Sequence, residues 1–270
     1  MDHRAARICI ILFATALSVL ARAQPSPEAG AGEHKSAEGF EYTDKVGHWH
    51  VRIPGEWSVG PEELLKAANA EAAKLAGKFA GNFRYVLLLI PTSPARRTSY
   101  ILVQETPTSD LGATYDQIEA ELKSQNPDKL PAEVKEATRG LIEATSTTQP
   151  VLDRVRNRYT TTSTQKATDG KELKSVWVTY LGRGSNVQFN CYATSDTFDA
   201  QMPAFARITD SFAYDPGYEF VPGGPNDAGR PMWTSGALVG GLVGVGAALV
   251  YGLSIKGRKD AAKPPADGRG

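Results

Sequence analysis

Apolar and polar residues alternate near the start of the central part of the chain. In Trp49–Ile53 every second residue is apolar, and the residues between them are His50 and Arg52. A period of two is typical of a strand with one buried face. Phe40–Asp44 precedes this strand across a turn at Lys45–Gly47, so the pattern predicts a strand pair at the start of a folded domain.

Further strands are expected along the rest of the domain. They are Tyr85–Ile90, Tyr100–Thr106, Val155–Thr164, Leu173–Leu181 and Val187–Ala193. Tyr85–Ile90 is apolar throughout, which predicts a central strand covered on both faces. Asp169-Gly170 indicates a hairpin, and a second glycine-rich turn at Gly182–Ser185 precedes the last strand.

Helical periodicity separates these strands. The expected helices begin at Pro61 and end at Gly77, cover Thr114–Gln125 and Pro131–Ala144, and begin again at Ser195 as N-cap. The first would bury Leu64, Leu65, Ala68, Ala72 and Leu75, and the last Phe198, Met202, Phe205, Ile208 and Phe212. Pro203 either kinks the last helix or marks a later start.

The strands cluster as hairpins, which favours an α+β fold with a mainly antiparallel central sheet covered by helices. We expect this domain over residues 40–215, and a Pro/Gly-rich linker over 216–231. Residues 24–39 are too polar to build a core and are interpreted as a flexible leader.

The N-terminus has the pattern of a secretory signal peptide. A basic start precedes thirteen apolar residues and the small residues Ala21 and Ala23, so residues 1–23 are expected to be removed. The alternatives are a core helix or an uncleaved anchor, but a membrane span needs about 20 apolar residues.

A second apolar stretch lies near the C-terminus. Residues 233–255 contain no charged side chain, and we expect residues 232–255 to form a transmembrane helix. Aromatic and basic residues flank it as interface anchors, namely Trp233, Tyr251, Lys256, Arg258 and Lys259. The basic tail 256–270 should stay cytoplasmic, which leaves the domain extracytoplasmic, in a bacterial periplasm or at a cell surface. The alternatives are a buried glycine-rich helix and a C-terminal sorting signal that is later removed.

Small residues recur every four positions in this stretch. They are Gly236, Gly240, Gly244, Ala248 and Gly252. On a helix they form one narrow stripe that another helix can approach closely, so we expect self-association or a protein partner within the bilayer.

Charge argues against nucleic acid as a partner. Residues 24–233 carry 22 basic and 27 acidic residues, and nucleic-acid binding needs clustered Lys and Arg.

Two segments resemble the Mog1/PsbP-like domain family. VGHWHVRIPGEWSV, with Pro54 and Trp57, is similar to the opening strand of these domains. NVQFNCYA and the following TFDAQMPAFARITDSF, with Ser211-Phe212, are similar to their last strand and helix. The resemblance covers roughly residues 40–214 and implies an antiparallel sheet sandwiched by helices. It also implies a mostly non-enzymatic family whose members bind proteins or support assembly.

His48 with His50, and Cys191, are the candidates for a metal site and for a reactive thiol. His48 and His50 are two apart, so on one strand both point to the same face, where they could bind a metal with His34 or an acidic residue as third ligand. Half-exposed histidines without a metal are the alternative. Cys191 is expected to be a buried structural thiol, because Phe189 on the same strand face is a core residue.

The chain contains no GxSxG, HExxH or P-loop motif and no GxGxxG in a strand–turn–helix context, so neither an enzyme nor a cofactor is expected. The sequence therefore favours a single-pass, membrane-anchored, non-catalytic binding or assembly module. Two alternatives remain open: a metal- or thiol-dependent periplasmic enzyme, and a ligand sensor that acts through a partner membrane protein.

Overall fold

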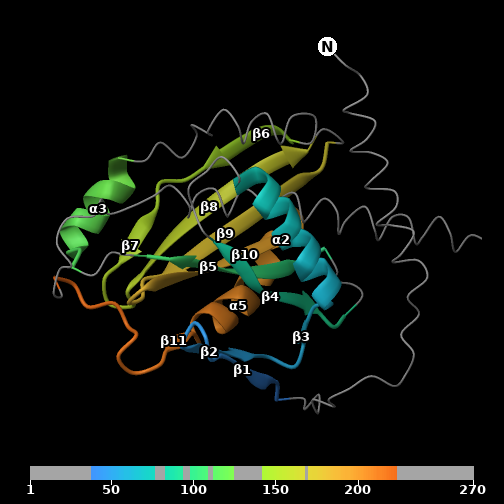
Figure 1. Ribbon diagram of the computed structural model, residues 1–270. Helices are drawn as coiled ribbons and strands as arrows, with labels where there is room; N and C mark the ends of the chain where they lie inside the picture. The colour runs from blue at the N-terminus through green and yellow to red at the C-terminus, as the bar shows by residue number, and fades with distance from the viewer. Residues whose placement is uncertain are drawn as a thin grey trace, which may run out of the picture. The chain divides into compact units, whose positions relative to one another are not determined.

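The computed structural model describes residues 38–76, 83–93, 98–108, 112–124, 142–167 and 170–223 (Figure 1). Within these ranges every strand pairing is antiparallel, and helices pack on both faces of the larger of two sheets. The expected α+β class with a mainly antiparallel sheet is therefore confirmed for the described part of the chain.

The larger sheet has eight strands. They are β3 (Trp57–Val59), β4 (Arg84–Pro91), β5 (Tyr100–Pro107), β6 (Ile142–Thr147), β7 (Val151–Asp153), β8 (Arg158–Ala167), β9 (Glu172–Tyr180) and β10 (Ser185–Thr194). Their order is β3-β4-β5-β10-β9-β8-β6, and β7 pairs with the same edge of β8 as β6 does. β10 therefore lies at the centre, between β5 and β9.

The smaller sheet contains β1 (Phe40–Asp44), β2 (Trp49–Ile53) and the two-residue β11 (Ala213–Tyr214). Asp44 shapes the tip between β1 and β2, because its Oδ1 accepts hydrogen bonds from the backbone N–H groups of Val46 (2.9 Å) and Gly47 (2.8 Å). β11 pairs with β2 through Ala213 opposite His50, so the last strand of the domain lies beside one of its first.

Three helices are described: α2 (Glu62–Ala76), α3 (Tyr115–Ser124) and α5 (Phe198–Thr209). α5 and the smaller sheet cover one face of the larger sheet. α2 packs on its opposite face, against β4 in particular. α3 packs against Tyr159, Leu181 and Phe220 in a separate small cluster.

Alternation along β10 explains why both faces of the sheet are buried. Val187, Phe189 and Cys191 face α5 and the smaller sheet, and all three are fully buried. Gln188 and Asn190 point to the opposite face. Their amides are buried but bonded to each other, with Gln188 Nε2 donating to Asn190 Oδ1 at 2.6 Å. Hydrogen bonding offsets the cost of burying these polar groups.

Most of the expected elements are confirmed. β1 and β2 have the expected bounds, β4 is covered on both faces, and β8 and β9 form the hairpin around residues 168–171. β4 is not central, because only β3 lies beyond it.

Several boundaries were wrong. Ile142–Ala144 belong to β6, not to a helix reaching Ala144; this strand pairs with β8 and continues through β-favouring Thr145 and Thr147. Residues 131–141 lie outside the described ranges. β8 begins at Arg158, because 154–157 form the turn from β7, with Asn157 at φ 50°.

The last helix begins two residues later than expected. Ser195 does not cap it; its hydroxyl donates to Glu172 Oε1 at 2.6 Å, and the N-cap is Thr197. Pro203 lies inside α5, and Phe212 lies beyond its end. The strands β3, β7 and β11, of two or three residues, were not expected.

Replacing Phe189 by Ala tests the central core. Its side chain is fully buried, so Phe189→Ala should lower the free energy of unfolding by about 3–5 kcal/mol through lost burial and a cavity. Val155 is 94% exposed, and Val155→Ala should change it by less than about 0.5 kcal/mol. Denaturant unfolding of the purified full chain measures both; equal effects would contradict this assignment of the core.

Candidate functional site

The segment after α5 brings the candidate site together. Ser211 follows the helix and is bonded to β2: its Oγ accepts from the Arg52 backbone N–H at 3.0 Å and donates to the Ile208 carbonyl at 2.7 Å. β11 then pairs with β2, and Glu219 forms a bridge with Gly182 beside the end of β9. Residues 210–220 therefore run between the smaller sheet and the open end of the β8–β9 hairpin, where β8 begins and β9 ends.

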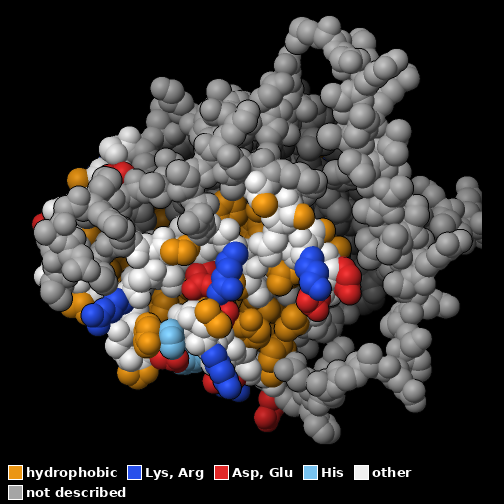
Figure 2. All heavy atoms as spheres, viewed as in Figure 1, with side chains coloured by type: hydrophobic (Ala, Val, Ile, Leu, Met, Phe, Trp, Pro, Cys, Tyr) orange, Lys and Arg blue, Asp and Glu red, His pale blue; other side chains and the backbone are white. Residues whose placement is uncertain are grey.

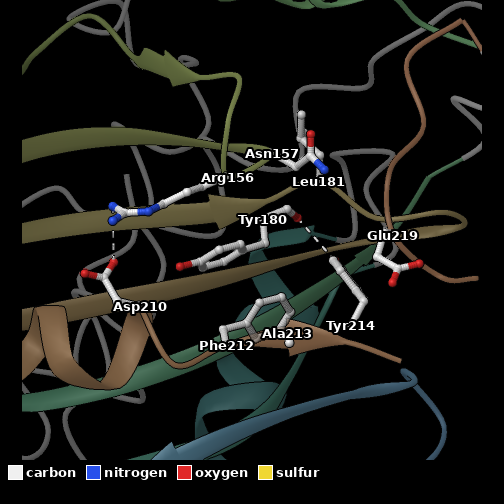
Figure 3. Close-up of a pocket in the computed structure, with 9 residues that line it drawn as sticks. All are labelled: Arg156, Asn157, Tyr180, Leu181, Asp210, Phe212, Ala213, Tyr214 and Glu219. Atoms are coloured by element: carbon white, nitrogen blue, oxygen red, sulfur yellow. Dashed lines mark hydrogen bonds and ion pairs between the residues drawn. The ribbon is translucent and has the colours of Figure 1, made fainter. Parts of the chain in front are cut away.

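A cavity of about 280 Å³ lies along this segment (Figure 3). Its lining comes from the β7–β8 turn, the end of β9 and residues 210–219. The lining residues are Arg156, Asn157, Tyr180, Leu181, Asp210, Phe212, Ala213, Tyr214 and Glu219. At about 30 Å³ per water molecule this is the volume of roughly nine waters, which suits a small ligand.

Aromatic rings form the apolar part of the cavity. The ring of Phe212 lies 4.4 Å from that of Tyr180 and 4.9 Å from that of Tyr214, centroid to centroid. It also contacts Trp49 (5.7 Å) and Phe189 (5.5 Å). Phe212 is therefore a core residue and a cavity residue at the same time.

Tyr214 is fixed at its hydroxyl as well as its ring. Its Oη lies 3.0 Å from the Ser185 carbonyl and 3.2 Å from the Tyr180 carbonyl, either of which can accept its hydrogen bond. Burial raises the pKa of Tyr214 above its usual value, so the hydroxyl stays protonated and remains a donor. Gly182 gives the ring its room, because a Cβ there would lie 2.4 Å from Tyr214 Cζ.

Asp210 and Tyr180 of the lining are held by Arg158, which does not itself line the cavity. Arg158 donates to Asp210 Oδ1 at 2.5 Å and to Tyr180 Oη at 2.8 Å, and Tyr180 donates in turn to the Thr209 carbonyl at 2.6 Å. Burial acts to lower the pKa of Arg158, but its bonds to Asp210 and Tyr180 outweigh burial and raise it. Asp210 is thus held by a permanently charged guanidinium.

His48 and His50 lie beside this segment, near Asp215. Nδ1 of His48 is 3.8 Å from Asp215 Oδ2, and Nδ1 of His50 is 3.6 Å from Asp215 Oδ1. The ring of His48 also stacks on Tyr218 with centroids 3.7 Å apart. These side chains are partly exposed, and Figure 2 shows histidine at the surface beside acidic and hydrophobic side chains.

The two histidines converge for a reason different from the one expected. His48 is not in β2 but in the turn before it, with φ 56°. Its carbonyl accepts the Asp215 backbone N–H at 2.8 Å, which places the Asp215 carboxylate between the two imidazoles. Across the described ranges, no set of three or more His, Cys, Asp and Glu side chains could hold a metal ion. His34 lies outside those ranges, and metal binding by His48 and His50 stays a prediction.

Cys191 is a free, fully buried thiol, as expected. Burial raises its pKa well above the usual value, which keeps it protonated and weakly nucleophilic.

The residues of the expected membrane segment all lie outside the described ranges. These are the stripe Gly236, Gly240, Gly244, Ala248 and Gly252, and the anchors Trp233, Tyr251, Lys256, Arg258 and Lys259. Among the helices that are described, none is both long and apolar enough to span a bilayer.

Sequence reasoning missed the cavity. Its polar residues Arg156, Asp210 and Glu219 come from a turn, a helix end and a loop, and share no motif. The sequence feature that lies closest to the cavity is Ser211-Phe212. It belongs to the segment that resembles the Mog1/PsbP-like family, and it predicts no binding site by itself.

No protein-family model matches the sequence, and no curated protein matches it either. Solved structures do show similarity to the fold. Cyanobacterial PsbP from Synechocystis sp. PCC 6803 is 15% identical, with a TM-score of 0.38, over 70% of this chain and 99% of that one.

Two further solved structures are similar to this chain. The Ran-binding protein Mog1p of Saccharomyces cerevisiae is 8% identical, with a TM-score of 0.36, over 66% of this chain and 96% of that one. LpqN of Mycobacterium tuberculosis, which is involved in cell envelope biogenesis, is 14% identical, with a TM-score of 0.30, over 66% of this chain and 86% of that one. Because these TM-scores are below 0.5, the α+β assignment rests on the strand order and register described above.

Replacing Gly182 by Ala tests the packing behind the cavity. The new methyl group would collide with the Tyr214 ring and with the Ser185 carbonyl (2.4 Å), so we expect unfolding to become easier by about 1–3 kcal/mol. In Gly184→Ala the new methyl group meets nothing within 4 Å, and only the positive φ of 92° costs about 1 kcal/mol. Thermal unfolding compares the two variants, and a smaller loss in Gly182→Ala than in Gly184→Ala would contradict the packing of Tyr214.

Proposed function

We propose that this chain is a membrane-anchored extracytoplasmic protein whose folded domain is a non-catalytic binding module. The observation that carries the proposal is the open cavity beside residues 210–220, with an aromatic floor and charged groups along its wall. Cavities of this composition, apolar surface with a few placed polar groups, are the usual setting for ligand binding.

The chemistry of the cavity supports binding over catalysis. Its tyrosines Tyr180 and Tyr214 have raised pKa values because both are buried, which opposes the action of either as a base near neutral pH. Arg158 and Asp210 neutralise each other in a close ion pair. The charged side chains of Arg156 and Glu219 also line the cavity and can orient a ligand.

The position of the cavity supports a link to the membrane. Glu219 lines the cavity, and the described part of the chain ends only four residues later, at Gly223. Only residues 224–231 separate it from the predicted span, and a fully extended chain of that length reaches about 30 Å. In the proposed topology the cavity therefore operates near the bilayer surface.

The proposed topology can be tested with single cysteines. Ser36→Cys should react with a membrane-impermeant maleimide in intact cells, and Ala266→Cys should react only after permeabilisation. The native Cys191 gives little background, because it is buried and protonated. Labelling of Ala266→Cys in intact cells would contradict the proposed orientation.

Blocking the cavity tests the binding role. Ala213 lines the cavity and is exposed, so Ala213→Trp should fill it and abolish recovery of the bound molecule when the full chain is purified from detergent-solubilised membranes. Thr43 is also exposed in the smaller sheet but does not line the cavity, so Thr43→Trp is the matched control. The amount of each co-purified molecule is measured by mass spectrometry for both variants. Recovery that is the same in both variants would contradict a binding role for the cavity.

A further inference from the structure

The arrangement of charges around the cavity indicates the class of its ligand, an inference that rests on the proposed binding function. Arg156 and Asp210 lie at one side of the cavity and Glu219 at the other, with Tyr180 between them (Figure 3). A ligand in the cavity can therefore contact the cationic Arg156 on one side and the anionic Glu219 on the other.

Arg156 can change partners at low cost. Its Nη1 is 3.8 Å from Asp210 Oδ1, and its side chain is 56% exposed. Such a long, exposed ion pair contributes little to stability. Asp210 keeps the closer partner Arg158, at 2.5 Å, so an anionic ligand group that binds Arg156 leaves no unpaired carboxylate behind.

Glu219 supplies the opposite charge. Its Oε2 accepts the Gly217 backbone N–H at 2.7 Å, which orients the carboxylate. Among the described residues, no Lys, Arg or His side chain forms an ion pair with Glu219. Its charge is therefore available to a ligand ammonium group.

The rings between these two sides suit an apolar ligand body. Tyr180, Phe212 and Tyr214 are each less than 10% exposed and are fixed by their contacts with one another. A body that packs on this rigid floor loses contact with water and gains dispersion contacts. The two ends of the same molecule then meet opposite charges.

We infer that the cavity binds a small zwitterion, with its acidic group on Arg156, its ammonium group on Glu219 and its apolar part over Phe212. A simple anion fits less well, because two carboxylates lie in the lining with Arg156. A simple cation leaves Arg156 without a new partner. Small amino acids whose two charged groups are separated along the molecule, and the zwitterionic headgroups of membrane lipids, share the required pair of charges.

The test uses a matched set of probes on the full chain in an uncharged detergent. The probe 4-(aminomethyl)benzoate carries the two charges at opposite ends of a ring, 4-methylbenzoate lacks the ammonium group and 4-methylbenzylamine lacks the carboxylate. Isothermal titration should show 4-(aminomethyl)benzoate, or the soluble headgroup glycerophosphoethanolamine, binding about tenfold more tightly than either single-charge probe, as expected for one added charge-assisted contact.

Variants assign the two ends of the ligand. Arg156→Gln and Glu219→Gln should each weaken zwitterion binding about tenfold. Arg154→Gln is the matched control, because Arg154 is on the same turn but pairs with Asp116 and Glu119 outside the cavity. Absence of binding by both zwitterions at about 10 mM, equal binding of 4-methylbenzoate, or an equal effect of Arg154→Gln would overturn the inference.

Vesicles distinguish the two sources of the zwitterion. Stronger competition by phosphatidylethanolamine vesicles than by phosphatidylglycerol vesicles would assign the site to lipid headgroups, and equal weak competition would assign it to free zwitterions. A result that rules out zwitterion binding does not by itself rule out the proposed binding function. Cysteine labelling and the Ala213→Trp comparison still report on anchoring and on binding of another ligand.

Discussion

The packing of Phe212 between the two sheets is the interaction on which the rest of the fold depends. Its ring contacts Trp49 and Tyr214 of the smaller sheet and Tyr180 and Phe189 of the larger one. Aromatic pairs in such geometries contribute about 0.5–1.5 kcal/mol each beyond the area they bury. Without this ring, the smaller sheet would lose these aromatic contacts with the larger sheet, and β11 would lose the buried side chain that precedes it.

The same packing creates the cavity. The wall is built from two segments that are far apart in the sequence, the β7–β8 turn and residues 210–219. The pairing of β11 with β2 is one of the contacts that bring them together. Arg158 then joins the two by bonding to Asp210 and to Tyr180 at once. The cavity lies where these packed segments meet. Its charged residues Arg156 and Glu219 have no close ion-pair partner among the described residues.

The sequence predicted the parts of this fold that depend on local periodicity. Alternation at Trp49–Ile53 and the turn at Asp169-Gly170 identify strands without reference to the rest of the chain. Short pairings such as β11 contain too few residues for any period, and they form because distant backbone groups need partners. The same limit explains β6, where helix-compatible residues became a strand beside β8.

The site was less predictable than the fold for the same reason. Cys191 was correctly placed in the core, since Phe189 on the same strand fixes its direction. His48 and His50 do approach each other, but through Asp215, which is 165 residues further along the chain than His50 and pairs with the turn through its backbone. Arg156, Asp210 and Glu219 form no sequence motif, because they come together only in the folded chain.

The Gly223–Ala113 hydrogen bond has a mechanical consequence. Any tension on the chain beyond Gly223 reaches the domain first at this bond, and next at the Glu219–Gly182 bridge and the short β11. These contacts involve few residues each and can open one after another, whereas the eight-stranded sheet behind them shares load across many pairs. A pull on the C-terminal side of the domain would therefore strip residues 213–223, with Tyr214 and Phe220, away from the domain and open the cavity before it disturbed the larger sheet.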